Sequence, residues 1–446
     1  MIAEFANSWT AHDTWIITTG ALAAVACSLL GCFLVLRKQS MMGDAISHAV
    51  LPGLAIAFIV TESRGSVVMF IGAAVVGVLT AVFTETVHRI GKVEQNASMG
   101  VVFTTLFALG LLLIENAAHH VDLDPGCVLY GALELVKLNS VSVLGMDIPQ
   151  AALNCGAVTL LNALFVFVCF KELRIATFDP DLATTLGINA MALHYGLMTL
   201  VAVTVVACFE AVGSIMVIAM LVVPAATAQL WTKQLGTMLA VAVSLGCGCA
   251  VLGHLGAILL PRLVNQPATN TQGMMAVMSG VFLAVAVLLA PQQGIVSRIV
   301  RRITLSQRIA AEDILGMLYR LESPVTQGTI VTLPDMSSIL RASGGVGSTG
   351  FRLALRKLTR DGKIVRAGAG CGLTDAGRAA AADIIRSHRL WEVYLSHHLG
   401  VPLHELHFAA EQLEHVTTPA MQQELANSAT DSEARDPHGR EIPKGR

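Results

Sequence analysis

The sequence predicts an all-α polytopic membrane protein with about eight or nine transmembrane helices, followed by a polar C-terminal part. Of its 446 residues, 54% are hydrophobic and only 13% are charged. The mean hydropathy of +0.66 is too high for a soluble globular protein. Charged residues are sparse in the first two thirds of the chain and frequent in the last third, so the two parts are expected to face different solvents.

Nine apolar stretches are long enough, or nearly so, to cross a bilayer as helices. They are Trp15–Leu36, Met42–Thr61, Ser66–Val87, Ser98–Glu115, Gln150–Phe170, Met191–Phe209, Gly213–Leu230, Gly236–Leu260 and Gly273–Ala290. Basic residues follow the odd-numbered stretches, as at Arg37 and Arg298–Arg302, whereas Arg64 and Arg262 are exceptions. The positive-inside rule therefore predicts an external N-terminus and a cytoplasmic C-terminus.

The second apolar stretch contains a carboxylate and an imidazole, Asp44 and His48. Ionisable groups are costly in lipid, and residues four apart share one face of a helix. Together they suit Mn²⁺, Fe²⁺ or Zn²⁺, and the following Pro52 and Gly53 predict a broken helix of the kind in which transporters build ion sites. We interpret the pair as a metal site in a translocation path. The alternative is that Asp44 caps a helix and His48 fills a polar gap between helices.

A polar stretch, His119–Pro125, follows the fourth apolar run on the predicted outer side. It makes His120, Asp122 and Asp124 candidates for an external gate or ion entrance. The alternative is a solvated loop in which Asp124 begins a turn before Pro125.

The segment Leu173–Asn189 is the least apolar part of the membrane half and lies on the predicted inner side. Asp179 and Pro180 predict a helix start, and Gly187 predicts its end. A short amphipathic helix at the cytoplasmic face is a surface that a partner ATPase can grip, although a plain connector is the alternative. The candidate coupling residues are Phe178, Asp179, Pro180, Asp181, Leu182 and Gly187.

Four stretches resemble, in the same order, the permease family of zinc, manganese and iron ABC importers. They are Arg37–Gly53, Gly100–Gly110, Phe178–Ala183 and Val212–Ala228. The resemblance implies that Asp44 and His48 contact the metal and that Asp179–Gly187 forms a coupling helix. It also implies three partners, which are a cytoplasmic ATPase, an extracellular or periplasmic metal-binding protein, and a second permease subunit that is either the same chain or a paralogue.

The chain contains no Gly-x-x-x-x-Gly-Lys-Ser/Thr motif, which is the motif that cradles nucleotide phosphates. We therefore expect a transport subunit that is not itself an enzyme, with ATP hydrolysis in a separate subunit. The rival class is a secondary transporter that needs no ATPase.

After the last apolar stretch, residues 298–374 predict a winged helix-turn-helix domain. Helical spacing indicates helices over Ser306–Glu322, Leu333–Ala342 and Gly347–Asp361, and Lys363–Thr374 is typical of a β-wing. Basic residues exceed acidic ones here, which suits the anionic inner leaflet or nucleic acid. The third helix could enter a major groove, with candidate contacts at Ser348, Thr349, Arg352, Arg356 and Lys357. However, the glycines in Ala342–Gly350 disfavour a helix and so argue against sequence-specific DNA reading.

The last part, 375–446, predicts a helical metal-binding and dimerisation domain. The segments Leu373–Arg378, Arg386–Glu392, Leu406–Val416 and Asp436–Pro443 resemble the diphtheria-toxin-repressor and manganese-regulator family. The resemblance places metal-site positions at Asp313, His388, Glu392, His407, Glu411, Glu414 and His415. The carboxylate at Glu411, where iron-type members carry a thiol, favours Mn²⁺. The alternative is a solvated dimerisation surface.

Together these features predict a permease over 1–297 in the cell inner membrane, which imports Mn²⁺, Fe²⁺ or Zn²⁺, with Mn²⁺ favoured. A metal-responsive cytoplasmic tail would regulate transport. The alternative is a membrane-tethered or proteolytically released metal-dependent transcriptional repressor combined with the permease, which would make DNA a further partner.

Overall fold

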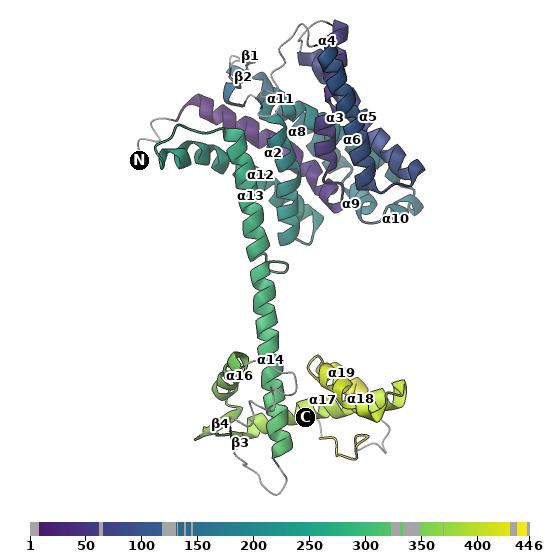
Figure 1. The fold of residues 1–446 in the computed structure, drawn as a ribbon, viewed down its shortest axis with the longest axis vertical. Coiled ribbons are helices and arrows are strands. Elements are labelled where there is room, and N and C mark those ends of the chain that lie inside the picture. Colours follow the sequence, from purple (N-terminus) through teal and green to yellow (C-terminus); the bar gives the residue numbers. More distant parts are fainter. Residues whose placement is uncertain are drawn as a thin grey trace. The chain divides into compact units, whose positions relative to one another are not determined.

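The computed structural model describes residues 9–61, 66–117, 131, 133–137, 140–143, 146–322, 331–332, 348–368, 370–428 and 435–443. The chain divides into two compact units, Met1–Ser297 and Arg298–Arg446. Helices dominate both units (Figure 1), which confirms the predicted fold class. Within the described ranges, 9 helices are long and apolar enough to cross a membrane, which agrees with the nine predicted stretches.

The first unit is built of helices with one small hairpin. Its elements are α2 (Ala11–Leu36), α3 (Met42–Ala49), α4 (Leu51–Thr61), α5 (Ser66–Gly91), α6 (Gln95–Ala117), η2 (Leu133–Leu135), β1 (Ser140–Val143), β2 (Met146–Pro149), α8 (Gln150–Val168), α9 (Phe170–Phe178), α10 (Pro180–Thr185), α11 (Ala190–Trp231), α12 (Leu235–Arg262) and α13 (Thr271–Leu289). Strands β1 and β2 pair antiparallel, with Val141 opposite Ile148. The sequence did not predict this hairpin.

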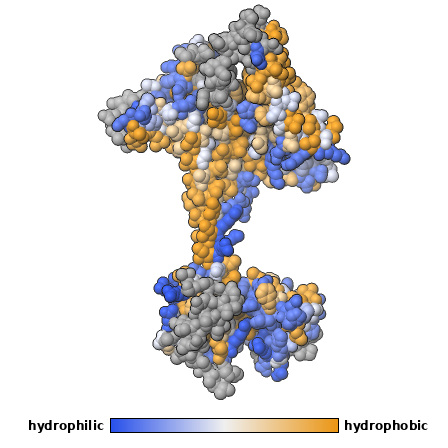
Figure 2. Space-filling view, in the orientation of Figure 1, coloured by the Kyte–Doolittle hydropathy of each residue, from blue (hydrophilic) through white to orange (hydrophobic). Residues whose placement is uncertain are grey.

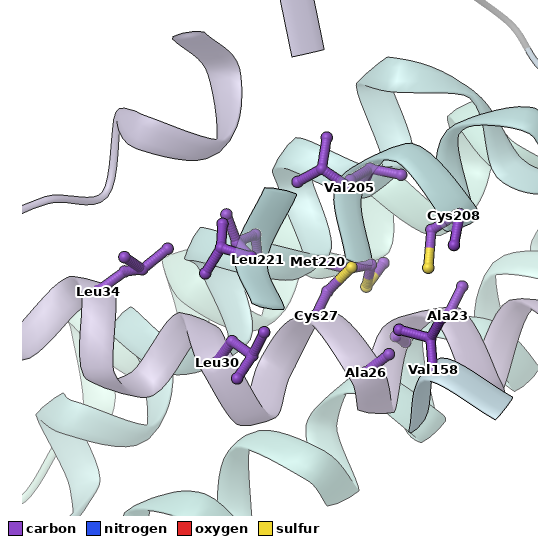
Figure 3. Close-up of a cluster of buried hydrophobic side chains, with 14 of the residues drawn as sticks. Ala23, Ala26, Cys27, Leu30, Leu34, Val158, Val205, Cys208, Met220 and Leu221 are labelled. Carbon is purple, nitrogen blue, oxygen red and sulfur yellow. The ribbon is translucent and has the colours of Figure 1, made fainter. Parts of the chain in front are cut away.

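Helix α2 lies at the centre of the apolar core. It begins at a capping box in which Thr10 accepts a hydrogen bond from the Asp13 backbone and the Asp13 carboxylate accepts one from the Thr10 backbone. Its buried side chains, including Cys27 and Leu30, pack with Leu221 of α11 (Figure 3). The functional segments described below are therefore mounted on a packed helical frame.

Two spans contain breaks. The second span is divided into α3 and α4 at Val50, two residues before Pro52, which has no backbone N–H to donate to a helix. In α11, Gly213 has φ 75° and ψ 163°, and this separates two spans of the same run. A Cβ atom on Gly53 of α4 would collide with the backbone of Gly72 in α5. These two helices therefore pack backbone to backbone, as small residues allow in membranes.

The second unit combines helices with a three-stranded sheet. Its elements are α14 (Ile295–Leu321), β3 (Val331–Thr332), α16 (Ser348–Arg360), β4 (Ile364–Ala367), β5 (Gly370–Leu373), α17 (Asp375–Leu399), α18 (Leu403–Glu414) and α19 (Pro419–Ser428). The strand order is β3-β5-β4, with antiparallel pairing. The β4–β5 hairpin coincides with the predicted wing and α16 with the predicted third helix, whereas the predicted second helix lies outside the described residues.

Helix α14 begins at Ile295, well before the predicted start at Ser306. Its second half supplies Ile314, Leu315 and Leu318 to a core shared with α16 and with Ile364 of β4. At its end, Glu322 accepts two hydrogen bonds of 2.9 Å from the Arg378 guanidinium. Helices α14 and α17 are thereby fixed together, which positions the acidic residues of α14 described next.

Candidate metal centres

The predicted pair in the membrane unit is formed on α3. Asp44 lies in the first turn of this helix and His48 in the last. The Asp44 Oδ1 and His48 Nε2 atoms are 3.4 Å apart, and both side chains are partly exposed. The His48 ring also contacts the rings of Phe103 and Phe107 of α6, with centroid distances of 5.7 and 6.0 Å. The pair offers one oxygen and one nitrogen donor, so a bound ion would need further ligands from water or another segment.

At the predicted outer ends of α2 and α12 there is a buried polar cluster that the sequence did not reveal. His254 is buried, and its Nε2 atom is 3.3 Å from Asp13 Oδ1. The Thr271 backbone donates a hydrogen bond of 3.1 Å to Glu134. The predicted gate residues lie outside the described part of the chain; they are His120, Asp122 and Asp124.

The predicted coupling segment folds as the short helix α10. Asp179 caps it by accepting a hydrogen bond of 2.9 Å from the Leu182 backbone, Pro180 occupies its first turn, and Gly187 has φ 81°. The side chains of Phe178 and Leu182 are exposed, as is that of Leu186. Phe178 and Leu182 line a groove of about 720 Å³ that Lys233 also lines. These exposed apolar side chains in and beside α10 are of the kind found at docking surfaces.

Close to α10, an ionic network centred on the buried residues Glu85 and His194 joins four helices. The Arg37 guanidinium donates to Thr177 of α9 (3.2 Å) and to Nδ1 of His194 on α11 (3.3 Å). His194 Nε2 is 3.2 Å from Glu85 on α5, and Arg89 also pairs with Glu85. Because Arg37 can only donate, Nδ1 of His194 accepts and its Nε2 carries the proton toward Glu85. The contacts of this network were not predicted from the sequence.

The second unit contains two groups of possible metal ligands among its described residues. The first, which we name cluster A, comprises His388, Glu392 and His407. His388 Nε2 is 3.1 Å from Glu392 Oε1 and 2.9 Å from His407 Nδ1. His388 and Glu392 are one turn apart on α17, and His407 comes from α18. Imidazole and carboxylate donors of this kind suit first-row divalent ions.

The second group, cluster B, comprises Asp313, Glu414 and His415. His415 Nε2 is 3.1 Å from Asp313 Oδ1 and 3.7 Å from Glu414 Oε1. The other carboxylate oxygen of Glu414 is 2.6 Å from His388 Nδ1 in cluster A. Glu414 therefore links the two clusters, which together connect α14, α17 and the end of α18.

The charged neighbours determine the protonation of both imidazoles. Burial alone would lower the pKa of these groups, but hydrogen bonds to Glu392 and Glu414 raise the pKa of His388 to about 9. In the same way, hydrogen bonds to Asp313 and Glu312 outweigh burial and raise the pKa of His415 to about 10. Without metal, both rings are therefore protonated at neutral pH, and an ion that binds there displaces their protons.

Six of the seven predicted regulatory ligands fall in the two clusters. The exception is Glu411, which belongs to neither group among the described residues. Two neighbours were missed. Glu312 lies 2.8 Å from His415, and His438 lies 3.9 Å from Glu392. His438 stands in the Asp436–Pro443 motif, so the motif itself was a signal for it.

The predicted DNA contacts lie along α16. Arg352 and Arg356 are exposed and Lys357 is partly buried, while Leu355 and Leu358 of the same helix pack in the core. The side chains of Ser348 and Thr349 and most of the glycine-rich stretch lie outside the described residues. The DNA contacts therefore stay a prediction.

Two protein families match this chain, one in the membrane unit and one in the second unit. Residues 13–289 match the ABC 3 transport family. Residues 374–444 match the metal binding and dimerisation domain of the iron dependent repressor. Both sequence resemblances are therefore confirmed.

Three individual relatives and one solved structure are similar to this chain. The manganese transport system membrane protein MntD of Bacillus subtilis (strain 168) is 42% identical over 67% of this chain and 99% of its own. The zinc transport system membrane protein TroD of Treponema pallidum (strain Nichols) is 35% identical over 64% and 75%. The manganese transport system membrane protein MntC of B. subtilis (strain 168) is 28% identical over 87% and 85%. The structure of PsaBC from Streptococcus pneumoniae in complex with Fab has 29% identity and a TM-score of 0.53, over 66% of this chain and 98% of that chain.

Proposed function

Because this chain belongs to the ABC 3 transport family, we propose that it is the membrane permease of an ATP-driven importer of divalent metal ions, with Mn²⁺ as the favoured cargo. Its relatives support this cargo class, since MntD and MntC are named for manganese transport and TroD for zinc transport. The observation that carries the proposal is the Asp44–His48 pair, with its donors 3.4 Å apart on a broken span.

The path begins outside, where a metal-binding protein delivers the ion. Asp44 and His48 then contribute an oxygen and a nitrogen donor to it, with His48 binding in its neutral form. A cytoplasmic ATPase binds Leu182 of α10 and the neighbouring Phe178 at the end of α9, and a second permease subunit completes the assembly. The C-terminus is cytoplasmic, which places the second unit on the side where imported metal accumulates.

The second unit acts as the metal-responsive part. Its two clusters offer only imidazole and carboxylate donors. This donor set suits Mn²⁺, which does not require a soft thiolate ligand. His388, Glu392 and His407 would hold one ion, and Asp313, Glu414 and His415 a second. Bound ions would supply positive charge to neutralise the clustered carboxylates, and their ligands from α14, α17 and α18 would then hold these helices together. Its effect is to reduce uptake when cytoplasmic metal is plentiful.

Uptake of radiolabelled Mn²⁺, Fe²⁺ and Zn²⁺ tests the transport proposal in cells that carry the partner ATPase and binding protein. His48→Gln is expected to abolish uptake of the cargo ion. The matched control is His88→Gln, which changes an imidazole at the end of α5 and is expected to preserve uptake. Normal uptake by His48→Gln would refute the metal role of the pair. Uptake that persists without the ATPase would instead indicate a secondary transporter.

The regulatory proposal has a separate test. A chain with His388→Gln is expected to transport normally but to lose the reduction in uptake at high metal. If uptake is unchanged and the purified chain instead binds a palindromic DNA site in a metal-dependent and strongly salt-dependent manner, the tail is a repressor.

A further inference from the structure

The start of α14 is placed immediately after the last span. Helix α13 ends at Leu289 and α14 begins at Ile295. The intervening turn is closed by hydrogen bonds, since the Gly294 backbone donates to the Ala290 carbonyl (2.9 Å) and the Ser297 hydroxyl donates to the same carbonyl (3.0 Å). The first turns of α14 therefore lie next to the membrane boundary at that end of α13.

These turns carry an apolar stripe, which we define as Ile295, Val296, Ile299, Val300 and Ile303. Their side chains are between 45% and 56% exposed in the chain. Their spacing of one, three and four residues puts them on one side of the helix. Among the described residues of the second unit, those that α14 contributes to the core begin only at Ala310, beyond the apolar stripe.

The other side of the same turns is basic. Arg298, Arg301 and Arg302 are all exposed. In Figure 2, apolar and polar residues accordingly occupy opposite sides of the exposed start of α14. The apolar stripe and the three arginines together make a basic amphipathic helix, which is the composition of segments that lie in a membrane interface.

We propose that the first turns of α14 bind an anionic phospholipid surface. The apolar stripe enters the acyl boundary, and Arg298, Arg301 and Arg302 contact the phosphate groups. Charge complementarity favours this occupant, because basic side chains next to a span are attracted to anionic headgroups. Pairing with a second copy through the apolar stripe is less favourable because it would leave Arg298, Arg301 and Arg302 on the far side of each helix, without an anionic partner. Nucleic acid would leave the apolar stripe in water.

The inference depends on the first unit lying in a bilayer, as the proposed function requires, but not on metal transport. The full chain is placed in nanodiscs of phosphatidylcholine with or without phosphatidylglycerol. The photo-crosslinking residue benzoylphenylalanine replaces Val300 in the apolar stripe. The matched control carries it at Leu305, an exposed residue of the same helix on the basic side. Both membrane faces are open in a nanodisc, so an error in the proposed orientation does not affect the result.

The expected product at position 300 is a lipid adduct, detected by mass, that forms several-fold more than at position 305. Phosphatidylglycerol should increase it, and the combined change Arg298→Gln, Arg301→Gln and Arg302→Gln should remove that increase. A crosslinked dimer at position 300 would overturn the proposal in favour of a second copy. Equal adducts at positions 300 and 305, or adducts insensitive to phosphatidylglycerol, would overturn the recognition of anionic lipid. Because the three arginines are exposed, the variant is expected to fold, and size-exclusion chromatography checks this.

Discussion

The substitution Glu414→Gln tests the metal clusters most directly. Glu414 is buried, with one carboxylate oxygen 2.6 Å from His388 in cluster A and the other 3.7 Å from His415 in cluster B. Glu414 is thus a candidate ligand for an ion in cluster B. It is also the hydrogen-bond partner of His388, a candidate ligand in cluster A. Glutamine keeps the shape of the side chain but removes its charge.

The size of the effect follows from these two contacts. Loss of a hydrogen-bonding partner of a metal ligand typically weakens metal affinity about 10- to 100-fold. Each tenfold change corresponds to about 1.4 kcal/mol. We therefore expect Glu414→Gln to lower the affinity of both clusters for their ions by about tenfold or more. By contrast, Glu411→Gln is expected to leave both affinities unchanged, because Glu411 belongs to neither cluster among the described residues.

The assay is titration of the purified full chain with Mn²⁺, in which the paramagnetic resonance signal of the hydrated ion reports free metal. Asp44→Asn and His48→Gln are present throughout to remove the proposed transport site. Circular dichroism establishes that each variant is folded. If Glu411→Gln weakens Mn²⁺ binding as much as Glu414→Gln does, the ligand assignment from the cluster geometry is refuted and the assignment of Glu411 from its family position is supported. If Glu414→Gln leaves Mn²⁺ binding unchanged, both clusters are refuted.

Three further predictions concern the membrane unit. Gly53→Ala should lower the free energy of unfolding by about 1–3 kcal/mol, because the added methyl group would collide with the backbone of Gly72. The control is Gly280→Ala, where the methyl group enters open space and should be tolerated or stabilising. Thermal unfolding in detergent compares the two variants. Glu85→Gln should also lower the free energy of unfolding, but by less than the roughly 3–5 kcal/mol expected for a fully buried pair, because its partner Arg89 is half exposed. An unchanged thermal unfolding midpoint would contradict a stabilising role. Leu182→Ser should reduce stimulation of the partner ATPase without changing Mn²⁺ binding, since this exposed side chain is proposed to contact only the partner; full stimulation would exclude this contact.

Much of the fold was predictable because its signals are local. A long apolar run must form helical hydrogen bonds within itself in lipid, so length and composition identify the spans. The start of α10 was predictable from Asp179 and Pro180, whose side-chain cap and fixed φ act within one turn. The β4–β5 wing was similarly marked by its glycines, and Gly368 in the turn has φ 59°.

Features that depend on distant packing could not be predicted in this way. Arg37 and His194 are 157 positions apart, and nothing in either local sequence indicates their contact. The start of α14 was missed for a different reason: the prediction used only the apolar residues from Ile309 onward, although apolar residues at helical spacing continue back to Ile295. Glu411 and Glu414 are one helical turn apart on α18, so the sequence could not show which carboxylate reaches α17.

The carboxylate of Glu414 belongs to one cluster while its hydrogen bond reaches the other. An ion that recruits this carboxylate must alter the environment of His388, and thermodynamic linkage requires the second ion to affect the first by the same factor. If both clusters hold ions as proposed, we therefore expect the two binding events to be cooperative, in one sign or the other. Metal binding by the second unit would then follow a curve whose Hill slope departs from one, which two independent sites of equal affinity cannot produce.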